Sequence, residues 1–212
     1  YVNNDFGKGG QATIKQLLAN SPTQVVAEIS TDQGQIDFSP AVLQAKQAGA
    51  DAIFAYTNEE ESARLLRELR KQGWTKPVIG ETTLTSSKVV ELAGEAANGA
   101  VAHVGLTVEA PPLQDFGKRY QALYNGVPDH NGVKGYTGMY ILKAAIEKAG
   151  KVDQKAAAAA IRNSCFSATQ HKGVLMDVCF DDKGDLDRES FITEIRNGKT
   201  VVAETLPPLN KK

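Results

Sequence analysis

The sequence predicts an α/β fold in which a doubly wound parallel sheet is followed by a largely helical segment. From Tyr1 to about Leu106, short apolar runs alternate with amphipathic helical patterns, and short connections join them. Such alternation specifies parallel strands linked by right-handed crossovers. After Leu106 three helical patterns follow one another without a strand between them. This part therefore cannot continue the sheet and is expected to cover another surface.

The first half of the chain supplies the predicted sheet. Strands are expected at residues 24–30, 51–56, 77–80 and 99–106. The run DAIFAY at 51–56 is largely apolar and too short for a helix, which favours a strand buried on both faces. Helices are expected at residues 7–20, at Pro40 onward with Ser39 as cap, at 59–72 with Asn58 as cap, and from Ser86 or Ser87.

The second half is predicted to hold three helices and a terminal hairpin. The helices are expected at residues 113–125, 136–149 and 153–163, with a loop over 126–135. An extended segment then follows, with a turn at Asp182 to Gly184. The pair Asn197–Gly198 predicts a hairpin, because both residues accept the positive φ of a type I′ turn.

The charge of the chain is nearly balanced, with 24 Lys and Arg against 25 Asp and Glu. Because there is no basic tract, the chain is not expected to bind nucleic acid or an anionic membrane. The longest apolar runs are far shorter than a bilayer span. The chain opens at YVNND without Met or a signal peptide, as expected of a mature protein whose signal has been removed, or of a fragment.

Cys165 and Cys179 are the two cysteines of the chain. A bridge between them would stabilise the fold by about 3 kcal/mol, because it would reduce the number of conformations available to the unfolded chain. Spacing alone leaves a disulfide and two unpaired thiols both open.

Polar and aromatic residues follow the predicted strands at their carboxyl ends, where ligands bind in open α/β sheets. These residues include the aromatic rings of Phe6 and Tyr56, the amide of Asn58 and the carboxylate of Glu81. A carboxylate can neutralise an ammonium group, and rings can cover an apolar side chain. The set suits a small polar ligand with an apolar portion.

Each of these residues also has a purely structural interpretation. Phe6 could pack as a hydrophobic staple, Asn58 could serve only as a helix cap, and Glu81 could be a solvated loop acid. Tyr136 lies one helical turn from Tyr140, a spacing typical of packing.

No motif in the sequence supports catalysis, a metal or a cofactor. The run GKGG lacks the Ser or Thr and the glycine spacing of a phosphate loop, and no G-x-S-x-G elbow is present. The three histidines are scattered, and the acidic residues around Gly184 fail the calcium-loop pattern. A solvated acidic turn is the preferred interpretation of that cluster.

Several segments together resemble a known family. They are YVNNDFGKGG, DFSPAVLQAKQAGADAIFAY, RKQGWTKPVIGETTLTS, ELAGEAANGA, YTGMYILKAAIEKAG, FDDKGD and NGKTVVAETLPPL, in that order. They resemble the C-terminal two-thirds of type I periplasmic substrate-binding proteins. Within these, the chain is most similar to the branched-chain amino-acid (Leu/Ile/Val-type) receptors of ABC importers.

The resemblance implies two α/β lobes that close on a ligand. Residues 1–105 would form the second-lobe α/β core, and residues 106–180 a helical segment that returns to the first lobe. Residues 181–212 would cross back and end in a hairpin that packs on the second lobe. The first lobe would then be incomplete in this chain.

The resemblance also implies roles for individual residues. The aromatic residue after the first strand of this lobe falls on Phe6, and a second aromatic position falls near Tyr56 to Asn58. A gapless alignment puts the acid that meets the ligand ammonium at Thr82, while a one-residue shift puts it at Glu81. The tyrosine of the first-lobe helix falls on Tyr136.

The implied function is that of a periplasmic, or membrane-anchored extracytoplasmic, solute-binding protein without enzymatic activity. It would bind an apolar amino acid or a related amphipathic solute and deliver it to an ABC permease in the membrane. Phe6 in place of tyrosine and the displaced acid leave an aromatic acid or an amide open as the ligand. The alternatives are a ligand-sensing domain of the same fold, such as an amide-type regulator or receptor ectodomain, and an α/β enzyme of the flavodoxin or Rossmann type.

Overall fold

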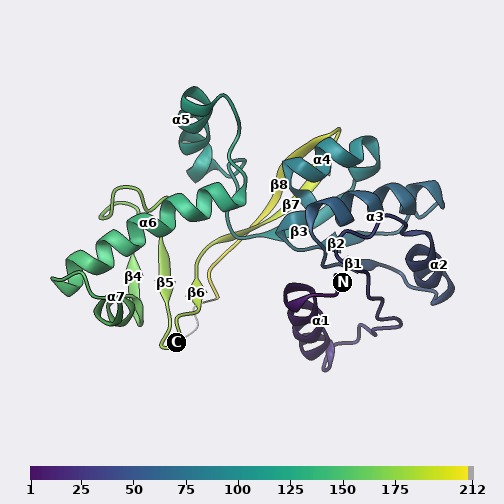
Figure 1. Cartoon of the computed structure of the whole chain (residues 1–212), viewed down its shortest axis with the longest axis horizontal. Coiled ribbons are helices and arrows are strands. Elements are labelled where there is room, and N and C mark those ends of the chain that lie inside the picture. Colours follow the sequence, from purple (N-terminus) through teal and green to yellow (C-terminus); the bar gives the residue numbers. More distant parts are fainter. Residues whose placement is uncertain (210–212) are drawn as a thin grey trace. The chain divides into compact units, whose positions relative to one another are not determined.

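The computed structural model describes residues 1–209 of the 212-residue chain. The chain divides into two compact units, which are described separately below (Figure 1). Unit 1 consists of residues 1–103 and 193–201, and unit 2 consists of residues 104–192 and the chain from 202 onward. The functional division at 105/106 and 180/181 stays a prediction.

The central sheet has five strands in the order β1-β2-β3-β7-β8. They are β1 (Ile53–Ala55), β2 (Val78–Gly80), β3 (Ala100–Val104), β7 (Ser190–Arg196) and β8 (Lys199–Leu206). The first three are parallel, with Ala55 beside Gly80 and Gly80 beside Ala102. The predicted α/β fold with a parallel sheet is thereby confirmed. The predicted hairpin is present too, since Asn197 and Gly198 both have positive φ between β7 and β8.

Four α-helices belong to unit 1. They are α1 (Asp5–Leu18), α2 (Ser39–Gln47), α3 (Glu59–Lys71) and α4 (Ser87–Ala93). The side chain of Asn4 caps α1 by accepting from Gly7 N, and that of Ser86 caps α4 by accepting from Val89 N. Helix α3 packs against α4 and buries an apolar stripe that includes Leu66. Short 3₁₀ turns at Thr82–Thr85 and Gly94–Ala97 flank α4.

Two expectations about the strands of unit 1 are wrong. Residues 24–30 form no strand, and only an isolated parallel bridge joins Val2 to Thr31. A ladder needs a continuous neighbour, and Tyr1–Asn3 supplies one only at the end of this stretch. In addition, β1 is not buried on both faces, because Phe54 is 41% exposed.

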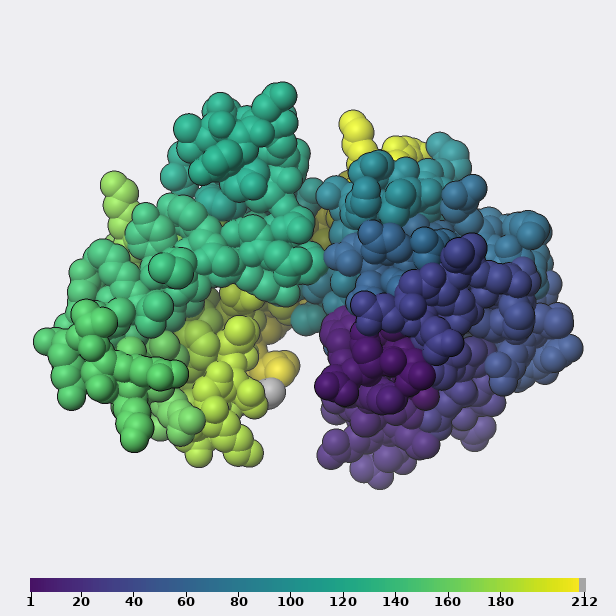
Figure 2. All heavy atoms as spheres, viewed as in Figure 1, coloured from purple at the N-terminus to yellow at the C-terminus, as the bar shows by residue number. Residues whose placement is uncertain are grey.

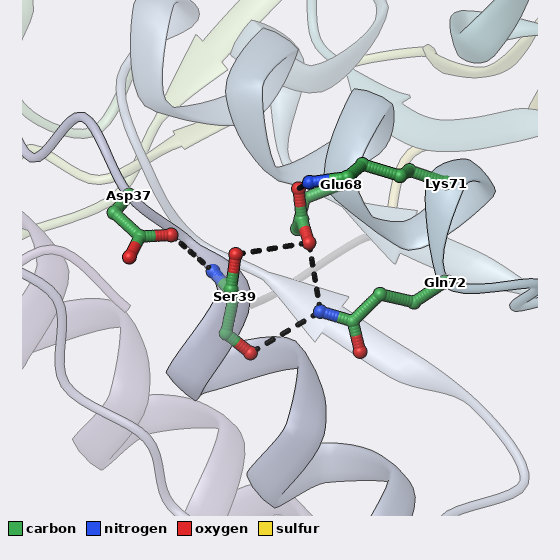
Figure 3. Close-up of polar contacts among 5 residues, drawn as sticks. All are labelled: Asp37, Ser39, Glu68, Lys71 and Gln72. Atoms are coloured by element: carbon green, nitrogen blue, oxygen red, sulfur yellow. Dashed lines mark hydrogen bonds and ion pairs between the residues drawn. The ribbon is translucent and has the colours of Figure 1, made fainter.

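Ser39 does not cap α2, as had been expected, because Phe38 takes the capping position and Ser39 is the first helical residue. Its hydroxyl instead donates to Glu68 Oε1 in α3, at 3.0 Å (Figure 3). Gln72 Nε2 donates to the same Glu68 oxygen at 2.8 Å, and Asp37 Oδ1 accepts from Ser39 N at 2.8 Å. This network ties the start of α2 to the end of α3.

The described part of unit 2, up to residue 209, contains three α-helices and a small antiparallel sheet. The helices are α5 (Gln114–Tyr124), α6 (His130–Ala149) and α7 (Gln154–Ile161), with a 3₁₀ turn at Pro111–Leu113; the strands are β4 (Ser164–Phe166), β5 (Val178–Phe180) and β6 (Leu186–Asp187). Helix α6 starts at His130 rather than at the predicted Tyr136. The Asp129 side chain explains the earlier start. It accepts a hydrogen bond from Gly132 N at 2.7 Å, and so provides a partner for a backbone N–H group that has none within the first turn of the helix.

The core of unit 2 consists of two apolar clusters. Phe191 is fully buried with Leu113, Phe116 and Val133 in the first. The second includes Ile141, Ala145, Phe166 and Val178. Next to this second cluster, Cys165 of β4 and Cys179 of β5 are paired in the sheet and joined by a disulfide, which was one of the two expected alternatives.

Among residues 1–209, no helix is both long and apolar enough to cross a membrane.

Candidate ligand-binding site

Three segments of unit 1 meet at the carboxyl edge of its parallel sheet. Tyr56 follows β1 directly, and Glu81 follows β2. The first residues of the chain lie alongside, because Val2 N donates to Tyr56 O at 3.0 Å. Parallel strands end at a common edge, so the topology brings these segments together.

An aromatic pair occupies this edge. The ring centroids of Phe6 and Tyr56 are 4.5 Å apart and tilted by 43°, within the range favoured for ring pairs. Phe6 is 39% exposed, so the pair offers an apolar surface to solvent rather than closing a core. Burial, and to a smaller extent the charge of Glu81, raises the pKa of Tyr56. Like an ordinary tyrosine, Tyr56 carries its phenolic proton at neutral pH and can donate a hydrogen bond.

Gly10 leaves room for the Tyr56 ring. A Cβ added at Gly10 would lie 2.5 Å from the ring carbons of Tyr56, which is too close for any larger residue. Helix α1 can therefore approach the ring only because position 10 lacks a side chain. This was not predicted, although a glycine inside a helical pattern can signal such a close approach.

Glu81 is anchored by its own loop. Its Oε1 accepts from Thr83 N at 2.8 Å and also from the Thr83 hydroxyl. Thr83 Oγ1 in turn lies 2.6 Å from Thr57 O, the carbonyl beyond Tyr56. The carboxylate therefore caps the turn at Thr82–Thr85 and is fixed beside the aromatic pair. Thr83 was missed by the sequence reasoning.

The other predicted positions lie nearby but are less clearly oriented. Thr82 Oγ1 donates to His103 O at 3.4 Å, a contact at the long end of the range. Asn58 occupies the cap of α3, and its carbonyl accepts from Ser62 N, but its side chain makes no capping bond. Asn58 was expected to cap through its side chain, and the structure corrects that expectation.

Tyr136 lies in unit 2, on α6. Its ring centroid is 4.7 Å from that of Phe116 and 5.0 Å from that of Tyr140. A hydrogen bond with Tyr136 raises the pKa of Tyr140. Tyr136 is thus a packing residue within unit 2, as its spacing indicated, and its role toward a ligand stays a prediction.

Within the part of the chain that the structure describes, no group of three or more His, Cys, Asp or Glu side chains could hold a metal ion. The acidic turn around Gly184 is organised by Asp181, whose Oδ1 accepts from Lys183 N and Asp185 N at 2.9 and 2.8 Å. These backbone bonds lower the pKa of Asp181. The cluster is a turn held by its own backbone.

The carboxyl ends of parallel strands are where open α/β sheets usually bind small molecules, and the aromatic pair and the fixed carboxylate lie there. Comparison with known families leads to the same class. The model of the periplasmic binding protein family matches residues 1–200. The chain belongs to this family.

Individual relatives agree with this assignment. The leucine-, isoleucine-, valine-, threonine- and alanine-binding protein of Pseudomonas aeruginosa is 25% identical over 194 residues, which cover 88% of this chain and 49% of that protein. The Leu/Ile/Val-binding protein BraC3 of Rhizobium johnstonii is 27% identical over 202 residues, which cover 94% and 54%. The chain thus spans about half the length of the curated relatives it matches.

A solved structure shows the same fold at lower identity. The leucine-binding protein LivK of Thermotoga maritima superposes with a TM-score of 0.83 at 23% identity, over 97% of this chain and 58% of that one.

Proposed function

We propose that this chain is part of an extracytoplasmic solute-binding protein of an ABC importer, and that the carboxyl edge of unit 1 binds a small amphipathic solute. The observation that carries the proposal is the anchored Glu81 carboxylate beside the exposed Phe6–Tyr56 pair. An α-amino acid with an apolar side chain fits this chemistry. Its ammonium would meet Glu81, and its side chain would lie against the rings.

The family and the relatives support the proposal. The names of two relatives report the binding of branched-chain amino acids to those proteins. Delivery to a membrane permease, a periplasmic location and closure of two lobes on the solute are parts of the same proposal, as is the absence of catalysis. Tyr136 is proposed as a contributor from the other lobe of the whole protein.

An aromatic acid is a second candidate solute. The ring at position 6 is a phenylalanine, so the Phe6–Tyr56 pair could cover an aromatic ring. A solute-binding protein of Rhodopseudomonas palustris, solved in complex with 3,4-dihydroxybenzoic acid, has the same fold, with a TM-score of 0.80 at 20% identity over 97% of this chain and 58% of that one. Such a ligand carries a carboxylate and no ammonium, so Glu81 would repel it.

A thermal-shift screen of the whole protein tests the proposal and separates the two candidates. Leucine, isoleucine and valine are expected to raise the melting temperature, because binding to the folded state alone contributes about 2.7 kcal/mol at a hundredfold excess over Kd. Benzoate and 3,4-dihydroxybenzoate would raise it if the second candidate holds. A protein stabilised by neither group, nor by amides, would contradict the proposal.

A further inference from the structure

The loop that carries Glu81 is hydrogen-bonded to the β7–β8 hairpin. Its 3₁₀ turn ends at Thr85, whose hydroxyl oxygen lies 2.7 Å from that of Thr193 in β7. From β8, the hydroxyl of Thr200 donates to Thr85 O at 2.7 Å. Thr85 and Thr193 are 108 residues apart in the sequence, yet both belong to unit 1. The end of the turn is therefore fixed by two strands that lie far from it in the chain.

The two hydroxyls of the Thr85–Thr193 pair are buried. Thr193 is 0% exposed and Thr85 is 3% exposed. Thr193 also donates to Ala102 O in β3, at 3.3 Å. Both hydroxyl protons are used only if Thr85 donates to Thr193 while Thr193 donates to this carbonyl. Two valines would have nearly the same shape and would need no partners, so the hydroxyls add a fixed direction to what packing alone supplies.

A short, closed turn connects this pair to the carboxylate. Leu84 N donates to Glu81 O at 3.0 Å, and Thr83 N donates to Glu81 Oε1 at 2.8 Å. The Leu84 side chain, between Thr83 and Thr85, is 0% exposed. The turn thus has little room to shift, and a displacement of Thr85 would move the Thr83 amide that holds the carboxylate.

We infer that the buried Thr85–Thr193 pair is a positioning contact for solute binding, because it fixes the Thr83 amide and so the direction of the Glu81 carboxylate. The inference rests on the proposed role of Glu81 as the partner of the solute ammonium group. Neither threonine side chain is exposed enough to touch a solute. A carboxylate that is already held in one direction loses less conformational freedom when the ammonium group binds, and this preorganisation raises affinity.

Two variants of Thr85 separate positioning from packing. Thr85→Val keeps the branched shape and removes the bond to Thr193, whose own proton stays on Ala102 O. Thr85→Ser keeps the hydroxyl and loses a methyl group. Positioning predicts that the valine variant is the harmful one, whereas packing predicts that the serine variant is.

The first measurement is amide hydrogen exchange of the solute-free whole protein. The Thr83 amide is expected to exchange about 3- to 10-fold faster in Thr85→Val, the net value of one neutral hydrogen bond, and to change by no more than about twofold in Thr85→Ser. The amide of Leu66, within α3, reports on the overall stability of unit 1 and serves as the reference in each variant. Thr83 exchange that is unchanged in Thr85→Val, or that is faster in Thr85→Ser than in Thr85→Val, would overturn the inference.

The second measurement is calorimetric titration with leucine in two backgrounds. Thr85→Val is expected to weaken binding about 3- to 10-fold when Glu81 is present and by no more than about twofold in the Glu81→Gln variant, because both changes act through the same carboxylate. Equal losses in the two backgrounds would also overturn the inference. A wild-type protein that binds no solute would contradict the proposed function instead, while the exchange of Thr83 would still decide whether the hydroxyl pair fixes the loop.

Discussion

Unit 1 and unit 2 bury their apolar residues in different ways. Unit 2 packs large side chains such as Phe191 and Leu113 into closed clusters and adds a disulfide beside one of them. Unit 1 has a parallel sheet with a free edge at β1, where Phe54 stays 41% exposed over a cavity. The same sheet carries the aromatic and acidic residues of the candidate site at its carboxyl edge. Parallel strands thus place a candidate site at their carboxyl ends. Each strand, however, is covered only when neighbours distant in the sequence pack beside it.

Truncation of the closed cluster should give the largest effect. Phe191→Ala removes a side chain that is 0% exposed and is expected to lower the free energy of unfolding by about 3–5 kcal/mol, through lost burial and a residual cavity. Urea unfolding followed by far-UV circular dichroism measures this loss. The control Leu123→Ala alters a helix residue that is 76% exposed and should change stability by no more than about 0.5 kcal/mol. Equal effects of the two variants would contradict the packing of unit 2.

Removal of the disulfide should have the next largest effect and should be confined to unit 2. The double variant Cys165→Ser with Cys179→Ser is expected to lose about 3 kcal/mol. Trp74, the single tryptophan of the chain, is buried in unit 1 and reports on that unit by its fluorescence. The circular dichroism transition should shift while the Trp74 transition stays in place. An equal shift of both would show that the units unfold together.

Acid should weaken the α2–α3 network of unit 1 (Figure 3). The bond from Ser39 N lowers the pKa of Asp37, and the bond from Gln72 lowers that of Glu68. A carboxylate with a depressed pKa in the folded state stabilises the fold above its unfolded pKa, near 4. That stability is lost as the pH falls through the folded pKa values. Carbon-detected NMR titration of Asp37 and Glu68 should find both below their ordinary values, and ordinary values would refute the network.

Much of the fold follows from local sequence signals. Helix α3 is acidic in its first turn and basic in its last, and Gly73 takes the positive φ just beyond its end. The hairpin at Asn197–Gly198 likewise follows from two residues. The start of α6 was not predicted correctly. Gly132 lies within the first turn and weakens the helical pattern of the sequence, but the Asp129 cap stabilises the helix from His130 onward all the same. Residues 24–30 were misassigned because a strand depends on a partner far away in the chain.

The candidate site was predictable in outline but not in detail. Tyr56 and Glu81 were found because the ends of parallel strands meet at one edge. The anchoring of Glu81 by Thr83 depends on the 3₁₀ turn after β2, and the close approach of Gly10 to Tyr56 depends on how α1 packs on the sheet. The first contact lies within one loop, whereas the second joins elements whose relative placement no local pattern specifies. Figure 2 shows the purple, N-terminal part of the chain, which includes α1, reaching the surface of unit 1.

The most direct test of the binding function is isothermal titration calorimetry of the whole protein and its Glu81→Gln variant with leucine. The variant keeps the shape of the loop but loses the charge that would meet the ligand ammonium. Its affinity is expected to fall roughly 10- to 100-fold, the value of a hydrogen bond to a charged group. Leucine binding that is unchanged in the variant would contradict the role of Glu81 and, with it, the central claim for the carboxyl edge of unit 1.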